Sequence, residues 1–180
     1  MFPLASFRLI RHYSVRMMSH IEASMSKVDK KLQELGITLP TPAAPVANYV
    51  PFVRTGNLVI ISGQLCLGLD GKMADAHKGK VGAEVSPEVG QEAARLCAIN
   101  LLAQLKAAVG DLDKVTRCVR LGGFINAVPT FAALAPVMNG ASDLMVEVLG
   151  DAGRHARSTV GVAELPLDAC VEVEGMFEVQ

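Results

Sequence analysis

The sequence predicts one α+β domain, in which a single β-sheet is covered on one face by two helices. Three observations support this prediction. Alternating apolar and polar runs lie near both ends of the chain, two segments with helical apolar spacing lie between them, and turn signals separate them in the order β-β-α-β-α-β-β. With 180 residues, 51% hydrophobic and 19% charged, the chain has the composition of a globular protein with one core.

Residues 1–21 differ from the rest because they contain three arginines and no acidic residue, a net charge of +3. Such an acid-free, arginine- and serine-bearing leader is typical of a mitochondrial transit peptide, and RHYS at 11–14 resembles a processing site. We therefore expect a mitochondrial location, and a cytoplasmic one if the leader does not act in import. The alternative is a disordered basic tail or an unused upstream start, with Met17, Met18 or Met25 beginning the protein.

A short helix and a connection are expected over residues 22–39, because Val28, Leu32 and Leu35 have helical spacing and Gly36 follows them. The domain itself is expected over residues 40–180. It begins with a proline-rich connection and then two strands within 52–67, joined by a turn at 55–57.

The clearest helix signal begins at Ser86, which supplies an N-cap before Pro87 and Glu88. Gly110 ends this helix. Its apolar stripe is long enough to cover a sheet and consists of Val89, Ala93, Cys97, Leu101, Leu105 and Ala108.

Residues 114–126 alternate as a strand, and Gly122 and Gly123 indicate a bulge or a close approach of another segment. A second helix is expected near 130–149. Pro136, Asn139 and Gly140 predict that this helix is broken into two pieces. The second piece is expected to begin after an N-cap at Ser142 and to end at Gly150.

Two strands end the chain, one beginning near Arg157 and one over 170–179. If they pair as a hairpin through a turn at Leu165 and Pro166, Arg157 and Glu172 become neighbours. Two interpretations then stay open. The pair is a structural ion pair, or the guanidinium binds a substrate carboxylate bidentately while Glu172 holds water.

Several function classes lose support from the sequence. Residues 22–180 carry a net charge of −4, which disfavours nucleic acid as a partner, and no long apolar run predicts a membrane span. No nucleotide-binding or metalloprotease motif occurs, so we expect no cofactor and no metal. The four widely spaced cysteines are expected to be buried free thiols; they are Cys66, Cys97, Cys118 and Cys170.

Two motifs carry a resemblance: GNLVIISGQ at 56–64 and HARSTVGVAELPLDACVEVEG at 155–175. They resemble the reactive intermediate deaminase family, also called Rid or YjgF and historically known as L-PSP endoribonucleases, over about residues 40–180. The resemblance implies a chorismate-mutase-like α+β fold with one mixed sheet and a homotrimer with active sites between subunits. It also implies cofactor-independent hydrolysis of reactive 2-imino and 2-enamino acids, such as 2-aminoacrylate, to 2-oxo acids and ammonia.

Carried over by the resemblance, Arg157 binds the substrate carboxylate and Glu172 orients water. The implied substrate-binding residues are Tyr49, Ser62, Gly63 and Thr159, the last standing where the family often has cysteine. The family's pocket asparagine falls on Ala135, and Asn139 is the substitute. NGASDL and GRHARS, within residues 139–158, resemble a separate subgroup, so substrate identity stays open, and His155 is expected to be an exposed loop residue.

Three functions are compatible with these residues. The first is the imine or enamine deaminase, which the water-holding Glu172 favours. The second is a non-catalytic trimer that binds small carboxylates or acts as a chaperone-like partner. The third, which the acidic body disfavours, is an endoribonuclease or translation inhibitor.

Overall fold

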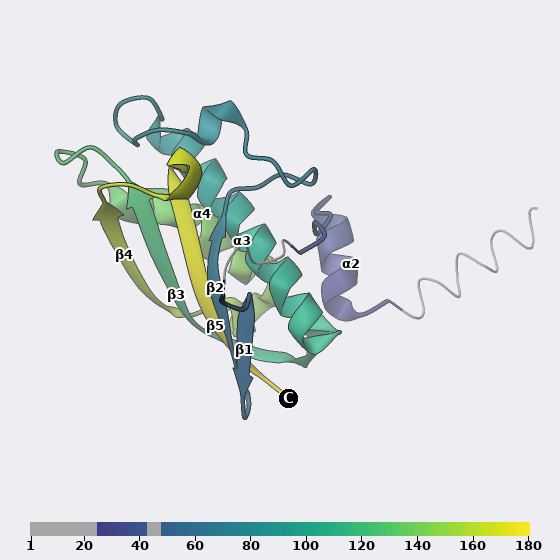
Figure 1. Ribbon diagram of the computed structural model, residues 1–180. Coiled ribbons are helices and arrows are strands. Elements are labelled where there is room, and N and C mark those ends of the chain that lie inside the picture. Colours follow the sequence, from purple (N-terminus) through teal and green to yellow (C-terminus); the bar gives the residue numbers. More distant parts are fainter. Residues whose placement is uncertain (1–24, 43–47) are drawn as a thin grey trace, which may run out of the picture.

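The computed structural model describes residues 25–42 and 48–180, so the predicted leader lies outside the described residues. A five-stranded sheet has the order β1-β2-β5-β3-β4, with β3 and β4 parallel and all other neighbours antiparallel (Figure 1). The prediction of one mixed sheet is therefore confirmed. The strands are β1 Phe52–Thr55, β2 Leu58–Leu65, β3 Val115–Asn126, β4 Ala156–Val162 and β5 Val171–Val179.

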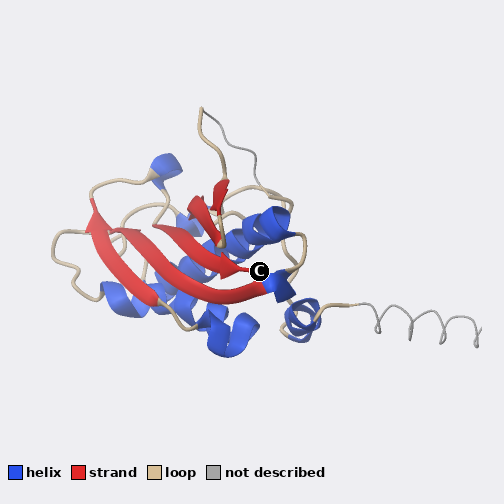
Figure 2. Ribbon diagram, turned by 90° about the horizontal axis from the view of Figure 1, so that it is seen from below, coloured by secondary structure: helices blue, strands red, loops and turns tan. Residues whose placement is uncertain are grey.

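The two long helices pack against the same face of this sheet, as predicted. Helix α3 contacts β2 and β5, and helix α4 contacts β3 and β4. Figure 2 shows how the strands curve around this helical layer. The α-helices are α2 Lys27–Glu34, α3 Pro87–Val109 and α4 Leu134–Leu149; the single 3₁₀ turns are η1 Asp75–His77, η2 Leu112–Lys114, η3 Gly150–Gly153 and η4 Pro166–Asp168.

Helix α3 begins and ends where its sequence signals predict. The Ser86 hydroxyl accepts a hydrogen bond from the Val89 backbone N–H at 3.3 Å, and Pro87 occupies the first turn. Gly110 ends the helix with φ of 79°, a conformation that favours glycine. In the part of the chain that the structure describes, no helix is both long and apolar enough to cross a membrane.

The predicted break in the second helix is wrong, because α4 is continuous. Pro136 is its third residue, where a backbone N–H has no partner within the helix, so proline costs no hydrogen bond there. Gly140 serves packing, since a Cβ at that position would lie 1.9 Å from the Gln91 carbonyl oxygen of α3. Ser142 is not an N-cap; it lies in the middle of the helix.

The predicted hairpin between the last two strands is also wrong. Strand β5 lies between β2 and β3, whereas β4 is an edge strand that pairs in parallel with β3. The chain crosses from β4 over β3 through η4, so the Leu165–Pro166 segment is a crossover and not a tight turn. Strand β3 therefore separates Arg157 from Glu172.

The two glycines of β3 mark close approaches and not a bulge. The register of β3 on β5 shifts between Val115 and Arg117 and again between Cys118 and Arg120, before the glycines. A Cβ at Gly122 would lie 2.6 Å from the Glu174 carboxylate, and one at Gly123 would lie 2.5 Å from Met138 Sδ on α4. The glycines thus make room for a carboxylate on one face and a helix on the other.

Strand β5 alternates as predicted. Val171, Val173 and Gly175 are buried against the helices, whereas Glu172 and Glu174 are only partly buried on the other face. We call that second face, which no helix of the described residues covers, the open face. The β1–β2 hairpin, with Thr55 paired to Leu58, is confirmed as well.

Candidate active site

Arg157 and Glu172 lie on opposite faces of the sheet. Arg157 is in register with Leu121, a buried residue of β3 that faces the helices. Glu172 is in register with Phe124, on the open face. Because partners in register point to the same side of a sheet, the structure places the predicted catalytic residues in two separate groups.

The Arg157 guanidinium is held by helix α4. Its Nη1 donates hydrogen bonds to Asn139 Oδ1 at 2.9 Å and to Ser142 Oγ at 3.1 Å. Among the described residues no carboxylate forms an ion pair with Arg157, so the structural Arg157–Glu172 ion pair is wrong. The side chain is exposed, and its positive charge is available to an anion.

His155 extends this arrangement, and the expectation of an exposed loop histidine is wrong. The ring is partly buried, with Nδ1 at 2.6 Å from the Gly153 carbonyl oxygen and Nε2 at 3.0 Å from Ser142 Oγ. Because a carbonyl oxygen only accepts, Nδ1 donates to Gly153, while Nε2 and the Ser142 hydroxyl share the second hydrogen bond. Ser142 Oγ keeps a lone pair for Arg157.

Thr159 lies two residues after Arg157 on β4, in register with Gly123 and so on the helix side. Its Oγ1 is buried and has no hydrogen-bond partner among the described residues. We call the set that meets here the Arg157 group, and it consists of Asn139, Ser142, His155, Arg157 and Thr159. Ala135, the position of the family's asparagine, is exposed near the start of α4.

The Glu172 carboxylate lies against Gly63 of β2, where any larger side chain would occupy its place. A Cβ at Gly63 of β2 would lie 1.7 Å from Glu172 Oε1, so the carboxylate rests directly on the glycine backbone. Burial raises the Glu172 pKa above its ordinary value, and the nearby Glu174 charge raises it further. Glu174 itself is paired with Arg120 at 3.0 Å, whereas Glu172 forms no ion pair with a described residue.

Ser62 joins the same end of β2 to the segment that precedes β1. Its hydroxyl donates to the Val50 carbonyl oxygen at 2.9 Å, and its backbone N–H donates to that of Pro51 at 3.0 Å. These bonds hold the segment that carries Tyr49, whose side chain is 52% exposed. We call Tyr49, Ser62, Gly63 and Glu172 the Glu172 group.

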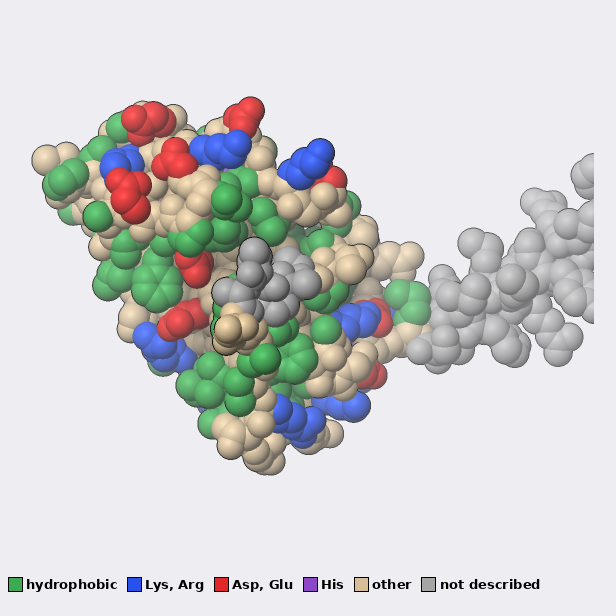
Figure 3. Space-filling model, in the orientation of Figure 1, with side chains coloured by type: hydrophobic (Ala, Val, Ile, Leu, Met, Phe, Trp, Pro, Cys, Tyr) green, Lys and Arg blue, Asp and Glu red, His purple; other side chains and the backbone are tan. Residues whose placement is uncertain are grey.

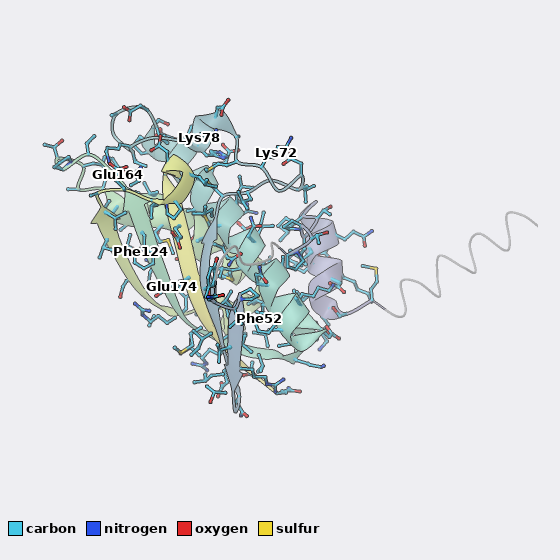
Figure 4. All side chains as sticks on the ribbon, in the orientation of Figure 1. Phe52, Lys72, Lys78, Phe124, Glu164 and Glu174 are labelled. Atoms are coloured by element: carbon cyan, nitrogen blue, oxygen red, sulfur yellow. The ribbon has the colours of Figure 1, made fainter. Side chains whose placement is uncertain are left out.

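The open face is apolar around these carboxylates. Val53, Ile60 and Val160 are 51%, 41% and 47% exposed there. Figure 3 shows hydrophobic side chains over the strands with acidic ones among them, and Figure 4 places Phe124 and Glu174 on neighbouring strands. The solvent-exposed face of an antiparallel sheet normally carries polar side chains. This face carries apolar ones, which is typical of a surface that contacts another protein chain.

Within residues 25–42 and 48–180 no group of three or more histidine, cysteine or acidic side chains is arranged to hold a metal ion. The Arg157 and Glu172 groups together offer one guanidinium, one partly buried carboxylate and hydroxyl groups. Such a set can bind a carboxylate and orient water.

Ser142 and His155 were missed as site residues by sequence reasoning. The signal that could have found them is the co-occurrence of NGASDL, which supplies Asn139 and Ser142, and GRHARS, which supplies His155 and Arg157. Nothing in either motif alone shows that helix α4 and strand β4 meet at these residues.

Comparisons with known proteins agree with this fold. The family model described as YjgF/chorismate mutase-like, putative endoribonuclease matches residues 29–178. Protein TCP17 of Trypanosoma cruzi is 46% identical over 153 residues, 84% of this chain and 94% of that protein. A protein of Escherichia coli strain K12 named 2-iminobutanoate/2-iminopropanoate deaminase is 33% identical over 142 residues, 77% of this chain and 94% of the relative.

A crystal structure of a protein with unknown function from Agrobacterium tumefaciens superposes with a TM-score of 0.79 at 48% identity, covering 85% of this chain and 92% of that one. The region matched by the family model includes both motifs and the five strands except the last residue of β5. The fold class predicted from the sequence is thereby confirmed, and the chain belongs to the YjgF, or Rid, family.

Proposed function

We propose that the protein hydrolyses reactive 2-imino and 2-enamino acids of the 2-aminoacrylate type to 2-oxo acids and ammonia. The observation that carries this proposal is the exposed Arg157 guanidinium, which α4 holds in place and no described carboxylate neutralises. Relatives that are named 2-iminobutanoate/2-iminopropanoate deaminase support the same chemistry.

The reaction needs little beyond positioning. A 2-enamino acid isomerises to its imine by taking a proton at C3, and water then adds to the C=N carbon. The tetrahedral carbinolamine expels ammonia and leaves the C=O group of the 2-oxo acid. Arg157 binds the carboxylate through paired N–H donors, and Glu172 accepts a proton from the attacking water. A carboxyl with a raised pKa suits this role because it exchanges protons nearer to neutral pH.

The two groups can act on one substrate only if different copies supply them. Arg157 and Glu172 lie on opposite faces within a protomer, whereas the apolar open face offers a surface for a second copy. We infer a homotrimer in which the Arg157 group of one copy meets the Glu172 group of the next. Closed rings of this kind use one repeated heterologous contact.

Glu172 separates this proposal from a purely carboxylate-binding module. Such a module has no need of a second negative charge beside its ligand, because that charge weakens binding of an anion. The same acidic pair, Glu172 and Glu174, disfavours RNA on the open face.

The activity is tested by the rate of 2-oxo acid formation from 2-aminoacrylate generated in situ by a dehydratase. The protein is expected to accelerate the reaction above the spontaneous rate. No acceleration with this substrate and with larger 2-imino acids, from a folded oligomer, would overturn the proposal in favour of the binding module.

Replacing Gly63 with alanine is expected to abolish most activity without unfolding the protein. The added methyl group occupies the place of Glu172 Oε1, so the carboxylate must turn away from its water site. Steady-state kinetics should show kcat reduced by about the same factor as in Glu172→Gln, on the order of 100-fold. Gly161→Ala is the matched control, because its Cβ meets Leu134 at an ordinary 3.7 Å. Unchanged kcat in Gly63→Ala contradicts the role of Glu172.

Replacing Ser142 with alanine is expected to weaken substrate binding. The change removes one of the two acceptors that hold Arg157 Nη1 and also the partner of His155 Nε2. Loss of a hydrogen bond to a charged group predicts KM raised about tenfold with kcat nearly unchanged. Asp143→Ala, the neighbouring exposed residue of α4, is the control. Equal KM values in the Ser142 variant and in the wild type would refute this positioning role.

A further inference from the structure

Three of the four cysteines meet at one end of the sheet, next to the strand ends that carry Gly63 and Glu172. Cys66 follows β2, Cys97 lies on α3 and Cys170 precedes β5, and all three are buried free thiols. The backbone brings these residues together: Leu65 is in register with Glu172, and the Cys170 backbone N–H donates to the His77 carbonyl oxygen at 2.9 Å. The Cys97 thiol contacts the Val171 carbonyl oxygen at 3.4 Å. Burial alone raises the pKa of the fourth cysteine thiol, Cys118 on β3. Cys66, Cys97 and Cys170 thus form a cluster.

A pocket of about 370 Å³ lies over this cluster, and Cys66, Met73, His77 and Leu96 contribute to its lining. Met73 Sδ lies 3.5 Å from Cys66 Sγ and covers it. Lys72 belongs to the same lining, and Figure 4 labels Lys72 and Lys78 in the upper part of the view. The pocket therefore extends to Cys66, and the flexible Met73 side chain contacts the thiol there.

His77 in the same lining is an independent sign of a reactive site. The residue is only 6% exposed, yet its Nδ1 has no hydrogen-bond partner among the described residues. A buried ring nitrogen without a partner is unusual in folded proteins. Because His77 and Cys66 line the same pocket, that nitrogen is left to form a hydrogen bond with a small ligand.

The three thiols of the cluster differ in the direction in which their pKa values are shifted. The hydrogen bond from Cys170, then that from Cys97, lowers the Cys66 pKa far below its ordinary value of 9, and the His77 charge acts in the same direction against burial. Burial and the Cys66 contact raise the pKa values of Cys97 and Cys170. Of the three thiols, Cys66 is the one whose pKa is lowered, and its position in the pocket lining beside His77 makes it the candidate nucleophile.

We propose that Cys66 is a peroxide-reactive thiol that forms a disulfide with Cys170. The Cys66 thiolate attacks one oxygen of a hydroperoxide, an S–O bond forms, the O–O bond breaks, and the departing alkoxide or hydroxide takes a proton from His77 or water. The Cys170 thiol then attacks the Cys66 sulfur, an S–S bond forms, and the S–O bond breaks to release water. Sulfur is oxidised and the peroxide is reduced to an alcohol or water.

Contacts in the cluster indicate which thiol attacks the oxidised Cys66 and what size of oxidant can reach it. The Cys97 thiol is already engaged with the Val171 carbonyl oxygen at 3.4 Å, so Cys170 is the freer thiol to attack. Because Cys66 is fully buried beneath Met73, a small uncharged oxidant has access where a bulky alkylating reagent does not. The thiol chemistry does not depend on the imine chemistry proposed above, although the cluster adjoins the strand ends that carry Gly63 and Glu172.

The four cysteines lie on four tryptic peptides, 55–72, 96–106, 118–120 and 158–180, which makes the test direct. The folded full chain is treated with equimolar hydrogen peroxide at pH 7, denatured in excess N-ethylmaleimide, digested and analysed by mass spectrometry without reduction. The proposal expects peptide 55–72 linked to 158–180, with Cys118 alkylated. Iodoacetamide added to the folded protein should label none of the cluster.

Matched variants make the result specific. Cys66→Ser is expected to slow peroxide consumption about tenfold or more, whereas Cys118→Ser leaves it unchanged. Cys170→Ser should retain Cys66 as a sulfenic acid that a 1,3-dione reagent traps. Four fully alkylated cysteines after peroxide treatment, or oxidation of Cys118 to the same extent as Cys66, overturns the proposal. The peptide map of the wild-type protein shows whether the Cys66–Cys170 disulfide forms even if a serine variant does not fold.

Discussion

Arg157→Ala is expected to lower kcat/KM for 2-imino acids on the order of 100-fold to 1000-fold, while the protein keeps its fold and oligomeric state. The guanidinium supplies charge-assisted hydrogen bonds to the substrate carboxylate, each of about 1.5–3 kcal/mol, and alanine supplies none. Because Arg157 is exposed on an edge strand, its removal leaves no cavity in the core. Kinetics with 2-aminoacrylate and circular dichroism measure the two parts of this prediction.

Arg154→Ala is the matched control for this change. Arg154 is an exposed arginine three residues earlier, and its Nε lies 3.4 Å from Asp151 on η3. Removing it takes the same charge from the same region without touching Asn139 or Ser142. Equal activity losses in the two variants would mean that general charge, not the Arg157 guanidinium, attracts the substrate. Full activity in Arg157→Ala would refute the assignment.

Glu172→Gln is expected to lower kcat about 100-fold or more, because the amide cannot accept the proton of the attacking water. In the wild type, kcat should rise with pH through the Glu172 pKa, which lies above its ordinary 4.5 because of burial and the Glu174 charge. The residual activity of the variant should lack this step. Glu178→Gln, on the same strand and face but at its far end, is the control.

Glu172→Gln should also stabilise the folded protein at neutral pH. A raised pKa means that the folded state binds the Glu172 proton more tightly than the unfolded chain does. The free energy of unfolding of the wild type therefore falls as pH rises from 4.5 through the raised pKa, and Glu172→Gln avoids this loss. Thermal unfolding should give the variant a higher Tm at pH 7 and an equal Tm near pH 4. A lower Tm at pH 7 would contradict the desolvation of Glu172.

The elements with local signals were predictable from the sequence. Ser86, Pro87 and Gly110 define α3 because N-caps, first-turn prolines and terminal glycines act through backbone bonds within a few residues. Likewise the alternation of Val171 and Glu172 separates the two faces of β5, since successive strand residues point to opposite sides.

What failed depended on contacts between distant segments. The Leu165–Pro166 segment has the composition of a turn, and nothing local shows that it crosses β3 instead of joining neighbouring strands. Pro136 has no disruptive effect because of its exact position in the first turn of α4, and Gly140 is explained only by Gln91 of α3. Strand order and helix packing are set by the whole core, not by the segment itself.

For the candidate site too, the identities of some residues were predicted from the sequence, whereas their arrangement required the structure. The resemblance supplied the identities of Arg157 and Glu172, but not their placement on opposite faces. Asn139 accepts a hydrogen bond from Arg157, while its role in substrate binding stays a prediction. Ser142 and His155 required the structure, because their hydrogen bonds join a helix to a strand.

The central claim is that Arg157 of one copy and Glu172 of another form one imine-hydrolysing site, and mixing inactive subunits tests it most directly. Arg157→Ala and Glu172→Gln chains are co-expressed in equal amounts, and 2-oxo acid formation from 2-aminoacrylate is measured. In a random three-membered ring about a quarter of the sites receive both intact residues, so the mixture should recover about a quarter of the wild-type rate. Activity no greater than that of the two variants alone would contradict the shared site.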